Sequence, residues 1–266
     1  TRNVNLPLYY YRRHGSNLTE APYKIINARR EIKHEKASRV IDNFRPIIGI
    51  IPCRKDHDFT ESLWSKKING VSLLERDINV CIQSEYFDQI VITCDEDIKS
   101  MYPNLFNKDK RLKFMLRDNS LTSKSSKIEE TLMLISNKFD NNHEGLMLMR
   151  YIQTPFITHK TLEEAINSLV ITRNDSVIAV EKIRHEIYEN KNEELIQLSS
   201  SLSDDINISN FYRDSSTCTV FKTSNLSKGH YRGEKILGMP VSAIESFFIN
   251  SFHDLEIASS SASINY

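Results

Sequence analysis

A cluster of charged side chains follows an apolar run near residue 50, and its residue types favour two opposed kinds of chemistry. The run is IIGII (47–51), and PCRKDHDFTESLWSKKING (52–70) comes directly after it. The cluster holds the basic residues Arg54, Lys55 and Lys66 and the acidic residues Asp56, Asp58 and Glu61. Basic side chains bind phosphate, whereas carboxylates repel phosphate and bind cations. Because no glycine precedes Gly70, the stretch also lacks the residue that most readily turns backbone N–H groups toward an anion.

The apolar run predicts a buried strand, and strand-like and helix-like segments alternate after it. Further strands are expected at 89–94, 112–117, 145–152 and 176–183, and helices at 72–84, 126–136 and 161–170. Because most of these strands are apolar throughout, the sequence predicts an α/β fold with a mostly parallel sheet and helices on both faces. Ligands of such sheets bind beyond the carboxyl ends of the strands. We therefore expect a ligand cleft where the strands that close at Ile51, Cys94 and Ile152 end.

The composition bears on the classes of partner. The 266 residues include 35 basic and 35 acidic side chains, so the formal net charge is zero and nothing favours nucleic acid or an anionic membrane. No apolar run approaches the length of a transmembrane helix and no secretory leader opens the chain, so we expect a cytoplasmic protein that binds small molecules or proteins. Wide spacing favours reduced thiols over disulfides or a zinc site for the four cysteines, Cys53, Cys81, Cys94 and Cys218.

Two segments stand apart from the alternation of strands and helices. The polar, serine-rich stretch 184–210 predicts an excursion after the central strands. Residues 21–45 mix charges with apolar side chains, with Thr19 as a candidate N-cap and Pro22 in the first turn. This pattern predicts a mostly exposed linker helix.

The tail before this helix contains LPLYYYRRHGSNLTE (6–20). It resembles the closing motif of inverting glycosyltransferases with the GT-A fold, in which an aromatic and basic stretch leads to His-Gly-x-Asn and a hydroxyl residue. The resemblance implies that residues 1–20 end a glycosyltransferase domain of the same polypeptide, where His14 would help to close the metal and sugar-nucleotide site. Thr1 is not a methionine, which suggests that the chain continues upstream. The alternative is that the three tyrosines pack on the linker helix and that the basic residues are solvated.

Residues 46–266 are expected to form a second unit, and five stretches mark it: IIPCR (50–54), YFDQIVITCDEDI (86–98), TPFIT (154–158), DSVIAV (175–180) and HDLEIA (253–258). In sequence and in order these stretches resemble those of the acylneuraminate cytidylyltransferases, the CMP-sialic acid synthetases. The resemblance implies the Rossmann-like fold of nucleotide-diphospho-sugar transferases. Such enzymes join CTP to a sugar acid and release pyrophosphate, with Mg²⁺ held by carboxylates, so CTP and Mg²⁺ are the expected ligands if the domain is active.

The resemblance also places nucleotide-binding roles on individual residues, and Arg54 would act in catalysis as well. These residues are Arg54, Lys66, Arg117, Ser125, Ser126, Thr154 and Pro155. Several positions depart from the family's pattern. Lys55, Asp56 and Asp58 stand where the phosphate loop has two glycines and a lysine. Lys124 replaces an aspartate at a helix start. Ile157 replaces an arginine and Tyr151 a glutamine, which puts base recognition in doubt.

The metal site is the most altered part of the resemblance. The family's Asp-Ile-Asp falls on Phe248, Ile249 and Asn250, so both carboxylates are missing and no metal ligand is assigned. Loss of one preorganised group costs roughly 10²- to 10³-fold in rate. The combined changes therefore predict impaired or lost catalysis. The alternative is a shifted arrangement in which Asp254 and the loop carboxylates hold the metal.

Other residues have two interpretations. Asp95, Glu96 and Asp97 follow a strand and could bind a metal, but a helix cap is the favoured interpretation. Trp64 either plugs the nucleotide cleft or covers the sheet edge. His57 lies in a loop and is expected to be solvated, because no histidine pair has helical ligand spacing near a carboxylate.

Two function hypotheses follow. The first is a cytidylyltransferase-like domain of surface polysaccharide biosynthesis whose catalysis is impaired or lost and which acts as a docking, dimerisation or ligand-sensing module fused behind a glycosyltransferase. The second is an active nucleotidyltransferase that forms a CMP-sugar from CTP and a nonulosonic acid. Binding of CTP with magnesium is expected for the second and not for the first. Related synthetases dimerise through an excursion after the strand that matches 176–183, so we expect residues 184–235 to leave the main sheet and contribute to a homodimer.

Overall fold

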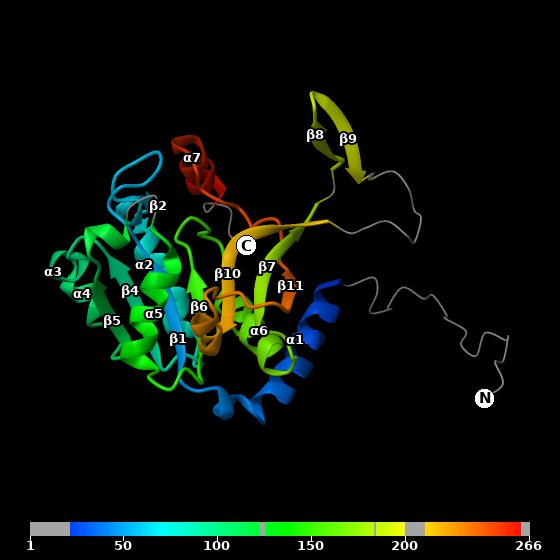
Figure 1. Ribbon diagram of the computed structural model, residues 1–266. Helices are drawn as coiled ribbons and strands as arrows, with labels where there is room; N and C mark the ends of the chain where they lie inside the picture. The colour runs from blue at the N-terminus through cyan, green and yellow to red at the C-terminus, as the bar shows by residue number, and fades with distance from the viewer. Residues whose placement is uncertain (1–21, 123–125, 184, 200–210, 262–266) are drawn as a thin grey trace, which may run out of the picture.

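The computed structural model describes residues 22–122, 126–183, 185–199 and 211–261 (Figure 1). The tail that resembles a glycosyltransferase end, Thr19, Lys124 and Ser125 lie outside these residues. Within them the chain forms one main sheet flanked by helices, which confirms the predicted α/β fold. None of the helices in the described part of the chain is long and apolar enough to cross a membrane.

Seven strands of the described residues form the main sheet in the order β11-β7-β10-β6-β1-β4-β5. Their bounds are β1 Ile47–Pro52, β4 Gln89–Cys94, β5 Leu112–Leu116, β6 Leu146–Arg150, β7 Ser176–Lys182, β10 Tyr212–Lys222 and β11 Ile236–Pro240. Every neighbouring pair is parallel except the two pairs that β10 makes. The sheet is therefore mostly parallel, and β4 begins and ends at the predicted residues.

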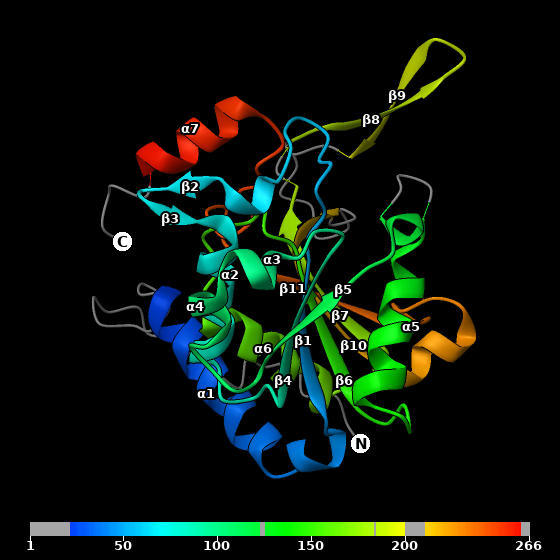
Figure 2. The ribbon, with the colours of Figure 1, turned by 90° about the vertical axis from the view of Figure 1, so that its left-hand side faces the viewer.

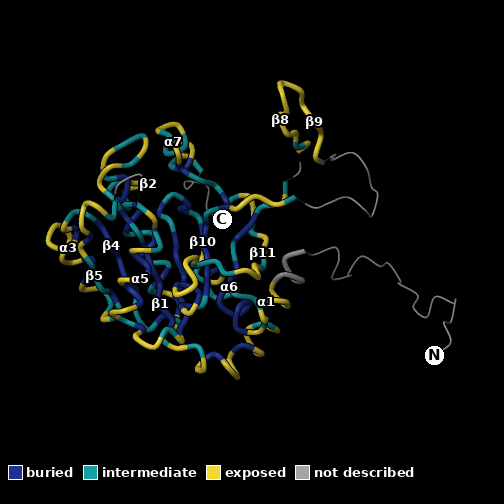
Figure 3. Tube along the Cα trace, viewed as in Figure 1, coloured by how far each residue is buried: buried dark blue, intermediate teal, exposed yellow. Residues whose placement is uncertain are grey.

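Helices cover both faces of the sheet, because successive residues of a strand point to opposite sides (Figure 2). One face carries α2 (Leu73–Gln83), α3 (Ile98–Met101), α4 (Pro103–Phe106) and α6 (His159–Val170). The other carries α5 (Ile128–Phe139) and the 3-10 helix η5 (Thr223–Lys228). In β1, Ile47 and Ile51 belong to the core of the first face, and Ile48 and Ile50 to that of the second. Figure 3 shows the central strands buried along most of their length.

Short elements surround the carboxyl edge of the sheet (Figure 2). They are η3 (Leu63–Ser65), β2 (Lys67–Ile68), β3 (Val71–Ser72), η4 (Asn119–Leu121) and α7 (Phe252–Ser261). The strands β2 and β3 pair with each other, and α7 packs against β2. The loop after β1 and the end of the chain therefore meet at this edge, although they are far apart in the sequence.

The segment after β7 departs in part from its prediction. Residues 184–235 do not all leave the main sheet, because β10 lies between β6 and β7 and is antiparallel to both. The physical reason is that Cys218, Val220 and Phe221 are buried, so this half of β10 completes the core. Of the described residues in that segment, β8 (Ile187–Lys191) and β9 (Glu194–Ser199) form an antiparallel hairpin that projects from the body (Figure 1).

The expected helix near the start of the chain is present as α1 (Pro22–Ser38), and 3-10 helix η2 (Ile41–Phe44) links it to β1. α1 is mostly exposed and packs along α6. Its contact uses charge as well as apolar burial: Arg30 and Lys33 both pair with Glu164, at 2.7 and 2.8 Å, while Ile32 remains 54% exposed.

Candidate functional site

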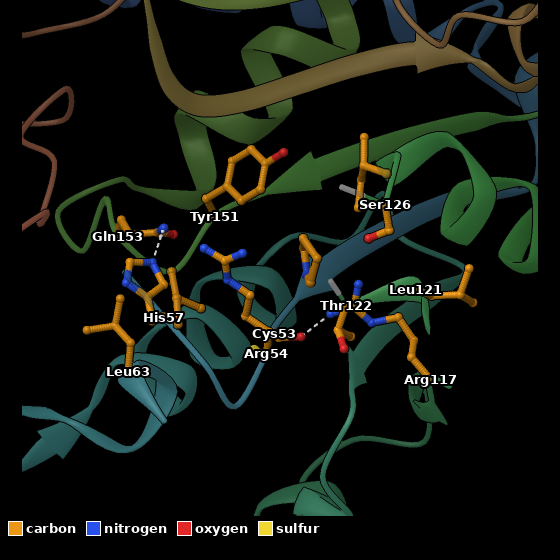
Figure 4. A pocket seen from close by; sticks show the side chains of 13 residues that line it. Cys53, Arg54, His57, Leu63, Arg117, Leu121, Thr122, Ser126, Tyr151 and Gln153 are labelled. Atoms are coloured by element: carbon orange, nitrogen blue, oxygen red, sulfur yellow. Dashed lines mark hydrogen bonds between the residues drawn. The ribbon is translucent and has the colours of Figure 1, made fainter. Parts of the chain in front are cut away.

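A cavity of about 270 Å³ opens beyond the carboxyl ends of β1 and β6, the edge at which α/β sheets bind ligands. Residues from the loop after β1, the segment after β5, the start of α5 and the segment after β6 line it (Figure 4). The polar lining residues are Arg54, His57, Arg117, Thr122, Ser126, Tyr151 and Gln153. Among the described residues, no Asp or Glu lines the cavity. Its polar groups therefore suit an anion. Cys94, at the end of β4, does not line this cavity although it was expected beside the cleft.

The first wall of the cavity is the loop over residues 53–63, and it closes on itself as a small hairpin. The Ser62 N–H donates to the Lys55 carbonyl at 2.7 Å, and the His57 N–H donates to the Thr60 carbonyl at 3.2 Å. These two bonds flank Asp56 and Glu61, whose backbones pair in antiparallel fashion. The side chains of Asp56 and Asp58 are exposed and do not line the cavity. The hairpin therefore keeps both carboxylates out of the cavity lining, although Asp58 stays 3.3 Å from Arg54, which does line it.

Two acidic residues directly after β4 hold this hairpin in place. Asp95 accepts a hydrogen bond from the Lys55 N–H at 2.7 Å, and Glu96 accepts one from the Ser62 hydroxyl at 3.0 Å. Burial opposes ionisation of Asp95, but hydrogen bonds led by that from Lys55 outweigh it and lower the pKa of the carboxyl. Asp97 caps α3 through the Ser100 N–H at 3.2 Å, so the cap interpretation is confirmed for this residue.

Two arginines supply positive charge from opposite sides of the cavity floor. Arg54 extends its guanidinium toward Tyr151 (Figure 4) and pairs with Asp58 at 3.3 Å. Arg117 is 8% exposed, and its guanidinium donates to the Cys53 carbonyl. Burial lowers the pKa of Arg117. Each guanidinium is thus held by the protein while it still borders the cavity.

His57 and Gln153 join the two walls across the cavity. The His57 Nε2 and the Gln153 Nε2 lie 2.8 Å apart, so the amide donates to the imidazole (Figure 4). His57 Nδ1 is buried and has no hydrogen-bond partner. Burial and the nearby Arg54 lower the pKa of His57, while Asp58 acts in the opposite direction. His57 is therefore a partly buried, neutral member of the site, and the expectation of a solvated histidine is wrong.

The second wall, residues 151–154, rests on a buried ion pair. Arg150 donates to Asp77 of α2 at 2.5 Å and to the Thr154 carbonyl at 2.6 Å, and both charged side chains are 1% exposed. Burial raises the pKa of Asp77 to about 6, and the attraction of Arg150 opposes this. The pair fixes the turn that presents Tyr151 and Gln153 to the cavity.

The structure brings together some of the residues to which nucleotide-binding roles were assigned. Arg54, Arg117 and Ser126 all line the cavity. Lys66 does not, and neither does Thr154, whose hydroxyl lies 3.2 Å from Arg150. Pro155 lines a shallow depression beside Arg76 instead. Ser125 lies outside the described residues.

Sequence reasoning did not assign roles to His57, Thr122, Tyr151 or Gln153. Thr122 and Gln153 carried a signal, because each follows a strand end by a few residues, where ligand-binding groups collect. The pairing of His57 with Gln153 joins residues 96 apart, and no local pattern predicts it.

The residues at the expected metal position do not fit a divalent cation. Ile249 is fully buried and donates its N–H to the Gln153 carbonyl at 2.8 Å. Asp254 accepts hydrogen bonds from Asn250 N–H and the Ser251 hydroxyl, at 3.0 and 2.7 Å, and so caps α7. Within the described ranges, no group of three or more His, Cys, Asp or Glu side chains could hold a metal ion.

Trp64 does not line the cavity. Its ring is 4% exposed and meets Tyr102 edge-on at 5.7 Å, beside α3. This contact agrees with the interpretation that Trp64 covers the sheet edge. The cysteines agree with their prediction as well: Cys53, Cys81, Cys94 and Cys218 are free and buried.

Comparison with known proteins identifies the sequence family and the fold. Residues 65–240 match the family model described as Cytidylyltransferase. No curated protein matches the sequence.

Three solved structures resemble the chain in fold. 4-Diphosphocytidyl-2C-methyl-D-erythritol synthase from Anaerococcus prevotii has 15% identity and a TM-score of 0.60, over 82% of this chain and 98% of that one. CMP:2-keto-3-deoxy-manno-octonic acid synthetase, solved with CTP, has 8% identity and a TM-score of 0.56 over the same shares. Another 4-diphosphocytidyl-2C-methyl-D-erythritol synthase has 11% identity and a TM-score of 0.57, over 81% and 98%. At these identities the likeness extends to the fold alone.

Proposed function

Because the chain belongs to the cytidylyltransferase family, we propose that the cavity beyond β1 and β6 binds a cytidine nucleotide while nucleotidyl transfer is impaired or lost. The observation that carries this proposal is the chemistry of the cavity. Arg54 and Arg117 line it together with hydroxyl and amide groups, and no carboxylate is among its described lining residues. A bound phosphate would therefore meet donors and positive charge.

The case for impaired transfer rests on Phe248 and Asn250, which stand where the resemblance expects metal-binding carboxylates. Magnesium takes oxygen ligands and is commonly held by carboxylates. A phenyl ring and an amide do not supply the charge for such a site, and Asp254 is committed to the cap of α7. The domain is then a nucleotide-sensing module rather than a synthetase.

The pathway and the arrangement of the polypeptide belong to the same proposal. The resemblance of residues 46–266 to CMP-sialic acid synthetases supports a role in making surface polysaccharides from nonulosonic acids, in the cytoplasm. That of residues 1–20 supports a glycosyltransferase domain upstream, joined by the helix within residues 21–45. The packing of α1 on α6 through Glu164 supports a fixed attachment of the linker to this domain.

The projecting hairpin supports a homodimer. Two-stranded hairpins are marginal on their own in water, yet β8 and β9 expose large apolar side chains: Tyr188, Leu195, Ile196 and Leu198. A second copy of the chain would cover them. Light scattering at high micromolar concentration should give a dimer, and a strict monomer would contradict this part of the proposal.

Calorimetric titration tests nucleotide binding. CMP and CTP should bind, AMP should bind at least tenfold more weakly, and Arg54→Ala should weaken cytidine-nucleotide binding about 10- to 100-fold, because a hydrogen bond to a charged group is worth roughly 1.5–3 kcal/mol. Lys55→Ala is the matched control, since Lys55 is an exposed cation of the same loop that does not line the cavity. Binding that is absent, or equally weakened by both variants, would overturn the proposal.

A pyrophosphate-release assay tests catalysis. With CTP, Mg²⁺ and a panel of nonulosonic acids, the domain should release no pyrophosphate above background. Robust release would establish the alternative, an active nucleotidyltransferase. That alternative gains support from the exposed position of Asp56, whose carboxylate does not line the cavity.

A further inference from the structure

We propose that the cavity selects a single phosphate attached to cytidine, as in free CMP or a CMP-linked sugar, over the triphosphate of CTP, and that it does so without a metal ion. The inference rests on the proposed function, because it names the class of cytidine nucleotide that the same site takes. Three features of the site support it: its charge, the state of its backbone N–H groups and its neutral hydrogen-bonding groups.

The positive charge of the cavity matches one phosphate and not three. Among the described lining residues, the cationic groups are the guanidinium groups of Arg54 and Arg117. Asp58 lies 3.3 Å from Arg54 and offsets part of its charge. A phosphodiester carries one negative charge and a phosphate monoester at most two, whereas the triphosphate of CTP carries up to four. The excess charge of CTP would therefore stay uncompensated unless a metal ion accompanied it.

The backbone of the first wall offers little to further phosphates. A loop that cradles a triphosphate turns several free N–H groups toward it. Here the N–H groups of Cys53, Lys55, His57 and Ser62 donate to Thr93, Asp95, Thr60 and Lys55 in that order, at 2.7, 2.7, 3.2 and 2.7 Å. These four N–H groups are therefore committed within the protein and are not turned toward the β- and γ-phosphates of a nucleotide.

Neutral groups beside Arg54 suit the nucleoside. His57 Nδ1 is buried without a partner, while its Nε2 is held by Gln153. The lowered pKa of this imidazole keeps it uncharged near neutral pH, so it does not add a third positive charge. Because Arg54 and His57 both line the cavity, a ligand with one phosphate can border both residues.

Calorimetry in EDTA tests the selectivity. CMP and CMP-sialic acid are titrated beside CTP, and each titration is repeated with Mg²⁺. CMP should bind at least tenfold more tightly than CTP in EDTA, and Mg²⁺ should leave the CMP affinity within about twofold. Binding of CMP without CMP-sialic acid would identify the free nucleotide as the ligand, and binding of both would include the sugar conjugate.

Two matched variants separate the charge argument from other causes. Asp58→Asn should remove the negative charge that offsets Arg54 and should raise the affinity for CTP more than that for CMP. The ratio of the CMP affinity to the CTP affinity should therefore fall at least threefold. Asp56→Asn removes the same charge from an exposed position of the same hairpin that does not pair with Arg54, and should leave the preference unchanged. Tighter binding of CTP than CMP in EDTA, or an equal change in both variants, would overturn this inference alone. Absence of binding by every cytidine nucleotide would overturn the proposed function and this inference with it.

Discussion

The two walls of the cavity are held in place by different kinds of contact. The wall after β1 is a hairpin held by its own backbone pairs and by Asp95 and Glu96, with charged side chains in solvent. The wall after β6 is a turn held by Arg150 and Asp77, both removed from solvent. Exposed hydrogen bonds contribute little to the free energy of unfolding. Removal of one partner of a buried ion pair costs more, because the other charge is left buried and unpaired.

This difference shows which part of the site can change in sequence. Side chains at the hairpin surface can vary in charge without disturbing the core, as Asp56 and Asp58 illustrate. The turn after β6 is coupled to α2 and through Thr217 to β10, so a change there reaches the whole sheet. Recognition can be retuned at the first wall, and stability depends more on the second.

Replacement of Asp77 tests the second wall and should have the largest effect. Asp77→Ala leaves Arg150 buried without its partner and should lower the free energy of unfolding by about 3–5 kcal/mol. Urea denaturation measures the change. Lys108→Ala, in the half-exposed pair with Glu75, is the control and should cost less than about 1 kcal/mol. Equal losses in both variants would contradict the distinction between the walls.

Replacement of Ser62 tests the first wall. Ser62→Ala removes the hydrogen bond to Glu96 and should lower the free energy of unfolding by about 0.5–1.5 kcal/mol. Hydrogen exchange should speed up at the amides of His57 and Ser62 and stay slow at Thr154, whose N–H donates to the Tyr151 carbonyl. Thr60→Ala, at the tip of the hairpin, should change neither measurement by much, because its hydroxyl donates to the neighbouring Glu61 carbonyl at 3.3 Å. A larger increase of exchange at Thr154 than at His57 would show that the walls are not independent.

The contact between the walls gives the smallest effect and depends on pH. The pKa of His57 is lowered in the folded protein, so the unfolded chain binds the proton more readily and stability falls as the pH drops below about 6.5. Because the ring is partly exposed, the loss should stay below about 1 kcal/mol. His57→Gln should make the melting temperature depend less on pH between pH 7 and 5 than it does in the control variant His230→Gln, because His230 is exposed. An unchanged slope of melting temperature against pH would show that His57 does not cause the loss of stability at low pH.

The sequence predicted most of the sheet because its strands carry a local signal. QIVITC (89–94) contains four β-branched residues in succession, Ile90 to Thr93, and β4 has those bounds. The strand β10 was not predicted, because its first half, around Arg213 and Asp214, is polar and exposed. The burial of its second half depends on β6 and β7, which lie earlier in the chain. The positions of Arg54, Arg117 and Ser126 at one cavity followed from the resemblance and the strand ends.

The rest of the site depends on contacts that no local pattern encodes. The types of Asp56 and Asp58 are plain in the sequence, but their outward direction follows from the closure of the hairpin on Asp95 and Glu96. Likewise, residues 21–45 predicted a mostly exposed helix, but the ion pairs of Arg30 and Lys33 with Glu164 of α6 join residues too far apart in the chain for a local pattern to predict.

The place of β10 between β6 and β7 has a consequence for synthesis on the ribosome. β6 and β7 leave the ribosome before the strand that separates them, so each has an open edge until Lys222 has been made. At about 5–20 residues per second this interval lasts several seconds. Open strand edges pair readily with other chains. A nascent chain that stalls between β7 and β10 therefore exposes the unpaired edges of both β6 and β7. Translation speed across that stretch therefore bears directly on the yield of folded protein.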